Sequence, residues 1–285
     1  MKNNKTDEIK MPLVSVIISV FNEEKYIRES ISCILNQTYK NLEIIIIDDY
    51  CTDNSITILN EFMDPRIILY KKTNEQRFLA TSRNIGINLA KGEYIILHDA
   101  DETCSNDRIE KQLNKAIELN GNVVVGCCVN KIYPDGNIIK MNLPTKHEEI
   151  IKGFTRIRNR VTIVSGTILA SRSIFEQFKY NESLKFMQDW DHMLRIYESG
   201  VVQFSNISEY LYNYYQRPKN VGLNPDWPDY NILIRFNQKR RKYGKTEFKN
   251  IIELKNHLQK NTIDRIFWGI FRAILAINIK LKNKI

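Results

Sequence analysis

The stretch VSVIISVFNEEKYIRESISCILNQTYKNLEIIIIDDYCTDNS, from Val14 to Ser55, decides the fold of this chain. A short apolar run rich in β-branched residues, Leu13–Val20, opens it, and a second such run follows at Leu42–Ile47. Runs of this length and composition are typical of strands that are buried on both faces of a parallel sheet. The segment between them, Glu23–Asn36, has apolar residues at helical spacing. The stretch therefore predicts a strand–helix–strand unit.

The same alternation continues to about residue 127. Apolar runs predict further strands at Arg66–Tyr70, Glu93–Leu97 and Asn122–Cys127. Amphipathic runs between them predict helices at Thr52–Met63, Thr81–Ala90 and Asn106–Leu119. Repeated βα units of this length predict an α/β fold whose mainly parallel sheet is flanked by helices on both faces.

The second half of the chain is less regular. Pro134-Asp135-Gly136 predicts the turn of a β-hairpin. Further elements are expected as strands at Val161–Ala170, Val201–Phe204 and Tyr210–Tyr215, and as a helix at Gln188–Ser199. From Asp229 onward the pattern is helical, which predicts a C-terminal helical extension.

Composition and motifs exclude several classes of protein. The chain has 285 residues, of which 43% are hydrophobic and 26% charged, so it can bury a large core. Its five cysteines form no CxxC pair, which argues against a zinc site or a disulfide framework and favours a reducing compartment. The motifs GxxxxGK[ST], GxGxxG and GxSxG are all absent. Their absence argues against a P-loop protein, a dinucleotide-binding protein and a nucleophile-elbow hydrolase.

Positive charge is concentrated near the C-terminus. Residues 235–285 contain 14 Lys and Arg but only 3 Asp and Glu, whereas the remainder of the chain is nearly neutral. Within this part, residues 262–285 predict a basic amphipathic helix that can lie on an anionic membrane surface. The alternatives are a solvated helical face, a helix docked on the rest of the protein, or a dimer contact. We expect no nucleic-acid partner, because only the basic tail favours one.

No targeting signal is apparent in the first residues. Residues 1–10 are polar and lack the apolar core of a signal peptide, and no run of 18 apolar residues occurs in the chain. We therefore expect a cytoplasmic protein that can bind peripherally to the inner face of the cell membrane.

Acidic residues follow two of the predicted strands. Asp48 and Asp49 end the second strand, and Asp99 and Asp101 follow the fourth. Ligands of open α/β sheets bind outside the carboxyl ends of the strands. Paired carboxylates at this edge suit a hard divalent cation that also binds substrate phosphates. The alternative is that these acids only cap the helices that follow.

Three blocks of sequence together resemble the family 2 glycosyltransferases, which have the GT-A fold. The first is Val14–Ser55, quoted above, and the second is SRNIGINLAKGEYIILHDAD, Ser82–Asp101, which ends in the position of the family's metal-binding DxD motif. The third, FMQDWDHMLR at Phe186–Arg195, resembles the block that carries the catalytic base. The resemblance extends from about Pro12 to Arg217. It implies a GT-A catalytic domain at residues 13–218, between a polar tail at 1–12 and a basic extension at 219–285.

The resemblance also implies a binding site for the nucleotide sugar. The positions that correspond to it lie at the ends of the first, second and fourth strands: Ser19, Phe21, Asn22, Glu23, Asp49, Asp99 and Ala100. Asp49 matches the acid that contacts uracil, which favours a UDP-sugar donor. Arg83 matches a basic residue near the diphosphate, and Arg77 is a rival for that role because the loop before the helix aligns loosely.

The catalytic roles follow in the same way. Asp99 and Asp101 are the implied ligands of Mn²⁺ or Mg²⁺, with Asp101 the more direct one, and Asp189 matches the general base. Gln188 replaces the Glu that usually precedes this base. A divalent metal would stabilise the diphosphate leaving group, while the base would deprotonate the acceptor hydroxyl. The residues alone favour Asp189 as a helix N-cap, and the resemblance reverses that preference. His98 could be a third metal ligand, but a residue in its position more often packs or lines the cleft.

The expected function is the inverting transfer of one sugar to a glycan or lipid-linked glycan of the cell surface. The QxxRW motif of processive members is absent, and Gln216-Arg217-Pro218 stands in that region. The alternative is a non-catalytic member of the fold that binds nucleotide or glycan and supports a partner enzyme.

Overall fold

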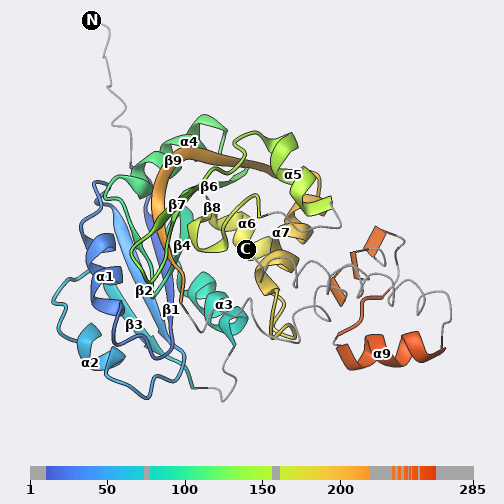
Figure 1. Cartoon of the computed structure of the whole chain (residues 1–285), viewed down its shortest axis with the longest axis horizontal. Helices are drawn as coiled ribbons and strands as arrows, with labels where there is room; N and C mark the ends of the chain where they lie inside the picture. The colour runs from blue at the N-terminus through green and yellow to red at the C-terminus, as the bar shows by residue number, and fades with distance from the viewer. Residues whose placement is uncertain are drawn as a thin grey trace, which may run out of the picture.

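The computed structural model describes residues 11–73, 78–155, 161–217, 233–234, 237–238, 241–242, 244, 246–249 and 251–260. In this part of the chain a curved sheet is covered by helices on both faces (Figure 1). The strands are β1 (Val14–Val20), β2 (Leu42–Asp48), β3 (Ile67–Lys71), β4 (Tyr94–Asp99), β5 (Thr103–Cys104), β6 (Val123–Ile132), β7 (Ile138–Met141), β8 (Leu169–Ser171) and β9 (Gln203–Tyr215). The helices are α1 (Ile27–Leu35), α2 (Ser55–Leu59), α3 (Leu79–Leu89), α4 (Arg108–Glu118), α5 (His147–Thr155), α6 (Arg172–Gln177), α7 (Gln188–Glu198) and α9 (Ile251–Lys260), with a short 3₁₀ helix, η1, at Ser165–Thr167.

The N-terminal half of the sheet is parallel, as predicted. Strands lie in the order β3-β2-β1-β4, and every neighbouring pair among them is parallel. All seven residues of β2 are buried, because helices cover both of its faces. The carboxyl ends of these strands consequently meet at one edge of the sheet.

The other half of the sheet is mixed, in keeping with the less regular pattern of the second half of the sequence. Beyond β4 the order is β8-β6-β9-β5, with β7 paired to β6, and only the β6–β9 pair is parallel. The predicted hairpin is confirmed as the antiparallel β6–β7 pair, in which Ile132 lies opposite Ile138.

Two predicted strand boundaries in this half are wrong. The run Val161–Ala170 forms η1 before the short strand β8, so most of it is not extended. The two strands expected at Val201–Phe204 and Tyr210–Tyr215 are one strand, β9. Its register against β6 shifts twice near Cys128, which is how a β-bulge absorbs the polar segment that separated the two predicted strands.

The two faces of the sheet carry separate apolar cores. One face packs on α1, α2 and α4, and the other packs on α3, α5, α6 and α7. Alternate residues of β1 divide between them: Ile17 joins the α3 side, whereas Val16 and Ile18 join the α1 side. This three-layer arrangement confirms the predicted α/β class.

Part of the C-terminal extension packs on the rest of the protein. Its buried apolar residues join the same core as α3 and α7; they are Leu233, Ile234, Leu254 and Leu258. Figure 1 shows α9 beyond α7 on the side away from β1. The predicted amphipathic helix at 262–285 lies outside the described residues. No helix within the described residues is long and apolar enough to span a bilayer.

Candidate active site

Three parallel strands bring the predicted site residues to one edge of the sheet. In the register of β1, Ser19 lies beside Asp99 of β4, and Val20 lies beside Asp48 of β2. The loops that follow these strands contain Phe21, Asn22, Glu23, Asp49, Ala100 and Asp101. The structure therefore gathers the described residues predicted to bind the nucleotide sugar and the metal at this edge. Arg77 lies outside the described residues.

Asp49 forms a buried ion pair. Its Oδ1 lies 2.5 Å from Nζ of Lys72, whose side chain is fully buried and also donates to Ser82 Oγ at 3.2 Å. Lys72 directly follows β3, so it reaches the same edge from the neighbouring strand. The sequence analysis missed Lys72, although the strand-end rule that selected Asp49 would have found it. This edge of the sheet thus contains a buried carboxylate with its counter-charge in place.

The loop after β1 is tied to the loop after β2. Asn22 has a positive φ of 55°, and its Oδ1 accepts a hydrogen bond of 2.7 Å from the Thr52 N–H. The Glu23 N–H donates to Ser55 Oγ at 2.8 Å. Phe21 is 42% exposed beside these polar contacts. Part of the Phe21 ring is therefore accessible from solvent beside these polar groups.

Asp99 is held from three sides. Arg83, from α3, approaches Asp99 Oδ1 to 3.3 Å and donates to Ser165 Oγ at 3.1 Å. The Asp99 N–H donates to the Tyr212 hydroxyl at 3.2 Å. Gly166 lies against this carboxylate so closely that an added Cβ would stand 2.2 Å from Asp99 Oδ2. The side chain is nevertheless 33% exposed, so a ligand can reach it.

Asp101 is paired with a residue that the sequence analysis did not select. Arg217, just beyond β9, donates to both the carboxylate and the carbonyl oxygen of Asp101. The pKa of Asp101 is raised by burial and by the charge of Asp99, which Arg217 opposes. Glu23 lies in the same electrostatic environment, where burial and then Asp101 raise its pKa to about 7.

Asp99 and Asp101 supply the hard oxygen ligands that Mn²⁺ and Mg²⁺ prefer. Their side chains are about one third exposed, and each now contacts a guanidinium group. Among the described residues, no group of three or more His, Cys, Asp or Glu side chains is placed to hold a metal ion. The donor set therefore fits a metal held by one or two carboxylates whose remaining ligands come from a diphosphate and water.

His98 packs behind the site and points away from it. It is 2% exposed, and its Nδ1 lies 3.1 Å from a guanidinium nitrogen of Arg108. Arg108 is fully buried and donates to the carbonyl oxygens of Leu97 and Gly166 at 2.9 and 3.0 Å. Of the two sequence-based readings of His98, the packing one is confirmed. The network also fixes the backbone on which Asp99 and Gly166 stand.

The third motif places Asp189 in the first turn of α7. The position before this helix is Met187, at φ 61°, so Asp189 is not the N-cap residue. Burial alone would lower the pKa of Arg83, but the influence of Tyr180, Asp99 and Asp189 outweighs it, and the pKa is raised. Asp189 is thus among the charges that raise the pKa of Arg83, together with Asp99, which pairs with Arg83 directly.

Neighbouring residues of α7 anchor it. Trp190 packs edge-on against Phe154 with ring centroids 5.4 Å apart, as expected for a packing residue. Asp191 and Arg195 stand at i,i+4 in the sequence, a spacing that predicts a helix-surface ion pair, and they pair at 2.8 Å. The sequence also predicts His192 on the outer face of this helix, but it is fully buried and stacks on Tyr180 with ring centroids 4.1 Å apart.

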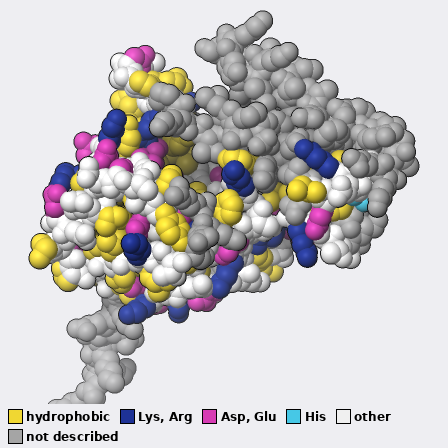
Figure 2. All heavy atoms as spheres, turned by 90° about the horizontal axis from the view of Figure 1, so that it is seen from below, with side chains coloured by type: hydrophobic (Ala, Val, Ile, Leu, Met, Phe, Trp, Pro, Cys, Tyr) yellow, Lys and Arg dark blue, Asp and Glu magenta, His cyan; other side chains and the backbone are white. Residues whose placement is uncertain are grey.

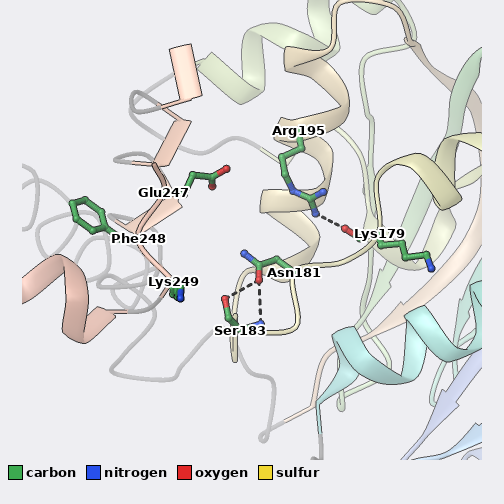
Figure 3. A pocket seen from close by; sticks show the side chains of 7 residues that line it. All are labelled: Lys179, Asn181, Ser183, Arg195, Glu247, Phe248 and Lys249. Carbon is green, nitrogen blue, oxygen red and sulfur yellow. Dashed lines mark hydrogen bonds between the residues drawn. The ribbon is translucent and has the colours of Figure 1, made fainter. Parts of the chain in front are cut away.

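The C-terminal extension contacts the same helix. Arg241 lies 2.6 Å from Glu198 and 3.8 Å from Asp191, both on α7, and 2.6 Å from Glu247 of its own segment. A pocket of about 480 Å³ separates the two parts; it is lined by Lys179, Asn181, Ser183, Arg195, Glu247, Phe248 and Lys249 (Figure 3). The Lys179 amine points out of this pocket and donates to Asn88 at 2.7 Å. The helix that carries Asp189 is thus held between the sheet and the extension.

Comparisons with known proteins agree with this arrangement. Residues 15–179 match the family model described as glycosyl transferase family 2. An uncharacterised glycosyltransferase of Methanocaldococcus jannaschii is 34% identical over 95% of this chain and 89% of its own length. Chondroitin synthase of Pasteurella multocida is 26% identical over 90% of this chain, which spans only 26% of that protein. The crystal structure of Staphylococcus aureus TarS 1–349 in complex with UDP-GlcNAc superposes with a TM-score of 0.63 at 18% identity, covering 79% of this chain and 66% of TarS, which shows the shared GT-A fold.

Proposed function

Because this chain belongs to the family 2 glycosyltransferases, we propose that it transfers one sugar, with inversion, from a nucleoside-diphosphate sugar to a hydroxyl of a glycan or lipid-linked glycan. The carrying observation is that Asp99, two residues before Asp101, pairs with Arg83, whose pKa is also raised by Asp189 from a distant part of the sequence. The proposal extends to a UDP-sugar donor of hexosyl or N-acetylhexosaminyl type. Two observations support UDP: Asp49 matches the uracil-contacting acid, and TarS was crystallised with UDP and with UDP-GlcNAc.

The part of the site proposed to bind the donor has groups for both the uracil ring and the diphosphate. Asp49 would accept a hydrogen bond from the uracil ring, and Lys72 supplies a counter-charge to this buried carboxylate at 2.5 Å. The exposed ring of Phe21 would cover one face of the base. Arg83 would contact the diphosphate, for which a guanidinium offers paired donors.

Asp99 and Asp101 would hold Mn²⁺ or Mg²⁺. When bound, the metal would supply charge stabilisation for the diphosphate that leaves. Asp189 would accept the proton of the acceptor hydroxyl while that hydroxyl attacks the anomeric carbon from the face opposite the leaving group. The Gln188 substitution removes one negative charge beside the base and leaves its carboxylate unchanged.

The acceptor is proposed to be a growing cell-surface polysaccharide. Absence of QxxRW from the sequence favours the addition of a single sugar over processive synthesis. A lipid-linked acceptor would suit residues 262–285 if they bind an anionic membrane, which would place the enzyme on the inner face of the cell membrane. The described surface seen in Figure 2 has basic and acidic side chains interspersed, and this view of it shows no continuous basic patch.

Calorimetric titration of the full chain with UDP, with and without Mn²⁺, tests the donor site. We expect binding that depends on Mn²⁺ and that Asp101→Ala abolishes. Binding of GDP or TDP in place of UDP would contradict the proposed donor class. Failure to bind any nucleotide would contradict catalysis and favour a non-catalytic member of the family.

A further inference from the structure

Arg217 occupies the carboxylate that the proposed function assigns to the metal. Its two terminal nitrogens donate to the carboxylate and to the carbonyl oxygen of Asp101, and one of them lies 3.6 Å from Glu102. Asp101 and Arg217 are 116 positions apart in the sequence. The Arg217 guanidinium is therefore the counter-charge that lies beside Asp101 and Glu102.

The contact is built by the fold rather than by a loose surface side chain. Glu102 accepts a 2.7 Å hydrogen bond from the Tyr215 N–H, which fixes the end of β9 beside the loop after β4. The Arg217 guanidinium lies 3.9 Å from the ring centroid of Tyr26, in the cation–π range, and its side chain is only 15% exposed. Tyr26 belongs to the turn that begins at Glu23, because its N–H donates to the Glu23 carbonyl. Arg217 thus joins three walls of the donor site.

We propose that Arg217 is a place-holder for the metal: it pairs with Asp101 while the site is empty, and it leaves Asp101 to bind the diphosphate when the metal and the donor bind. This inference rests on the proposed function. A guanidinium and a divalent cation repel each other if they share the Asp101 carboxylate, so metal binding displaces Arg217. The donor supplies a new anion within the same site, and a guanidinium binds phosphate oxygens through paired N–H groups. Arg217 therefore weakens metal binding when no donor is present, and it strengthens donor binding when the metal is present.

This exchange has a signature that a purely structural ion pair lacks. Removing the Arg217 charge strengthens metal binding in the absence of nucleotide, because Asp101 is then released. The same removal weakens nucleotide binding in the presence of metal, because the diphosphate loses a cation. A structural ion pair would leave both affinities unchanged or weaken both through disorder of the site.

The experiment uses the full chain and its Arg217→Gln variant. Electron paramagnetic resonance of free Mn²⁺ measures metal affinity without nucleotide, and calorimetry measures UDP affinity at saturating Mn²⁺. We expect Mn²⁺ to bind about tenfold more tightly and UDP about tenfold more weakly, each corresponding to loss of one charge-assisted contact of about 1.4 kcal/mol. Arg217→Lys should preserve weak Mn²⁺ binding. The matched control is Arg28→Gln, which removes an exposed ion pair with Glu61 and should change neither affinity.

A second variant guards against misfolding of the first. Tyr26→Leu removes the ring under the guanidinium but keeps its charge, so it should tighten Mn²⁺ binding and leave most of the UDP affinity intact. Unchanged or weakened Mn²⁺ binding in both folded variants would overturn the proposal, as would unchanged UDP binding in Arg217→Gln. Absence of UDP binding by the unaltered chain would instead overturn the proposed function and the diphosphate half of the exchange, while the Mn²⁺ titration would still decide the place-holder half.

Discussion

The two halves of the sheet contribute to the site in different ways. In the parallel half, Asp49, Lys72 and Asp99 each stand at or directly after the carboxyl end of a strand. In the mixed half, the residues that reach the site come from a 3₁₀ turn, a helix start and the end of a long bulged strand. The parallel half thus places its residues by topology alone, whereas the mixed half depends on packing between distant segments.

The difference indicates a division of labour. The parallel half fixes the groups proposed to bind the nucleotide, with a buried ion pair and a continuous strand register. The mixed half supplies Asp189 and Arg217, whose positions depend on contacts with α5, the C-terminal extension and the loops after β1 and β4. Variants in the first half should therefore affect nucleotide affinity. In the second half, variants of Asp189 and its supports should affect transfer more than affinity, whereas Arg217 and Gly166 should also affect affinity because they contact Asp101 and Asp99.

Asp189→Asn gives the largest expected effect and the clearest separation of the two halves. The amide cannot take the acceptor proton, so transfer should fall by about 10²- to 10⁴-fold, the usual contribution of a general base. UDP affinity should stay within twofold, because Asp189 lies outside the parallel half. The measurements are single-turnover transfer and UDP calorimetry. Asp135→Asn, in the exposed hairpin turn, is the matched control. Transfer that survives in Asp189→Asn would show that another residue is the base.

Lys72→Met should be the most destabilising change within the parallel half. It leaves Asp49 buried without its counter-charge, and breaking such a pair from one side typically costs about 3–5 kcal/mol of unfolding free energy. Urea denaturation measures this loss. The double variant Lys72→Met with Asp49→Leu should recover most of the stability but not UDP binding. Full UDP affinity in the double variant would show that Asp49 does not contact the nucleotide.

The parallel half was predicted well from the sequence, because a short apolar run followed by polar residues indicates both that the strand is buried and where it ends. Asp49, Asp99 and Asp101 follow apolar runs directly, so one local rule places all three at the same edge. Lys72 obeys the same rule and was overlooked, because a lysine after a strand is usually solvated; its burial depends on Ser82 and Asp49, which no local pattern reveals.

The mixed half was predicted less well for physical reasons. His192 was expected on the solvent face because the helix was read in isolation, whereas Tyr180 and Phe175 cover it in the structure. The sequence analysis mentioned Arg217 only as part of the segment that stands in place of QxxRW. Its contact with Asp101 joins residues 116 positions apart, which no local sequence pattern reveals. The role of Asp189 came from the resemblance, and the structure adds its electrostatic proximity to Arg83.

Gly166→Ala tests whether the mixed half shapes Asp99, a residue of the parallel half that is proposed to bind the metal. The added Cβ would meet Asp99 Oδ2 at 2.2 Å and the Tyr212 hydroxyl at 2.7 Å, so Asp99 must move. Overpacking of this kind typically costs about 1–3 kcal/mol, and we expect Mn²⁺-dependent UDP affinity to fall about tenfold. Thermal unfolding and calorimetry measure the two effects. The control is Gly136→Ala, which is strained by a φ of +83° but contacts nothing within 4 Å, and which should lose some stability without losing UDP.

Arg241→Gln should give the smallest effect and tests whether the extension positions α7. The Arg241 side chain is 18% exposed and contacts Asp191, Glu198 and Glu247. Because Glu198 and Glu247 are partly exposed, its loss should lower the free energy of unfolding by about 1–2 kcal/mol, less than for a fully buried cluster. Hydrogen exchange should increase in α7 and remain unchanged in β1 and β2. Transfer should fall severalfold while UDP affinity is retained, because the nucleotide is held by the parallel half. Arg241→Lys should recover part of the transfer rate. If exchange in α7 did not change, the extension would be a passive cover, and the position of Asp189 would be set by its contacts with the sheet alone.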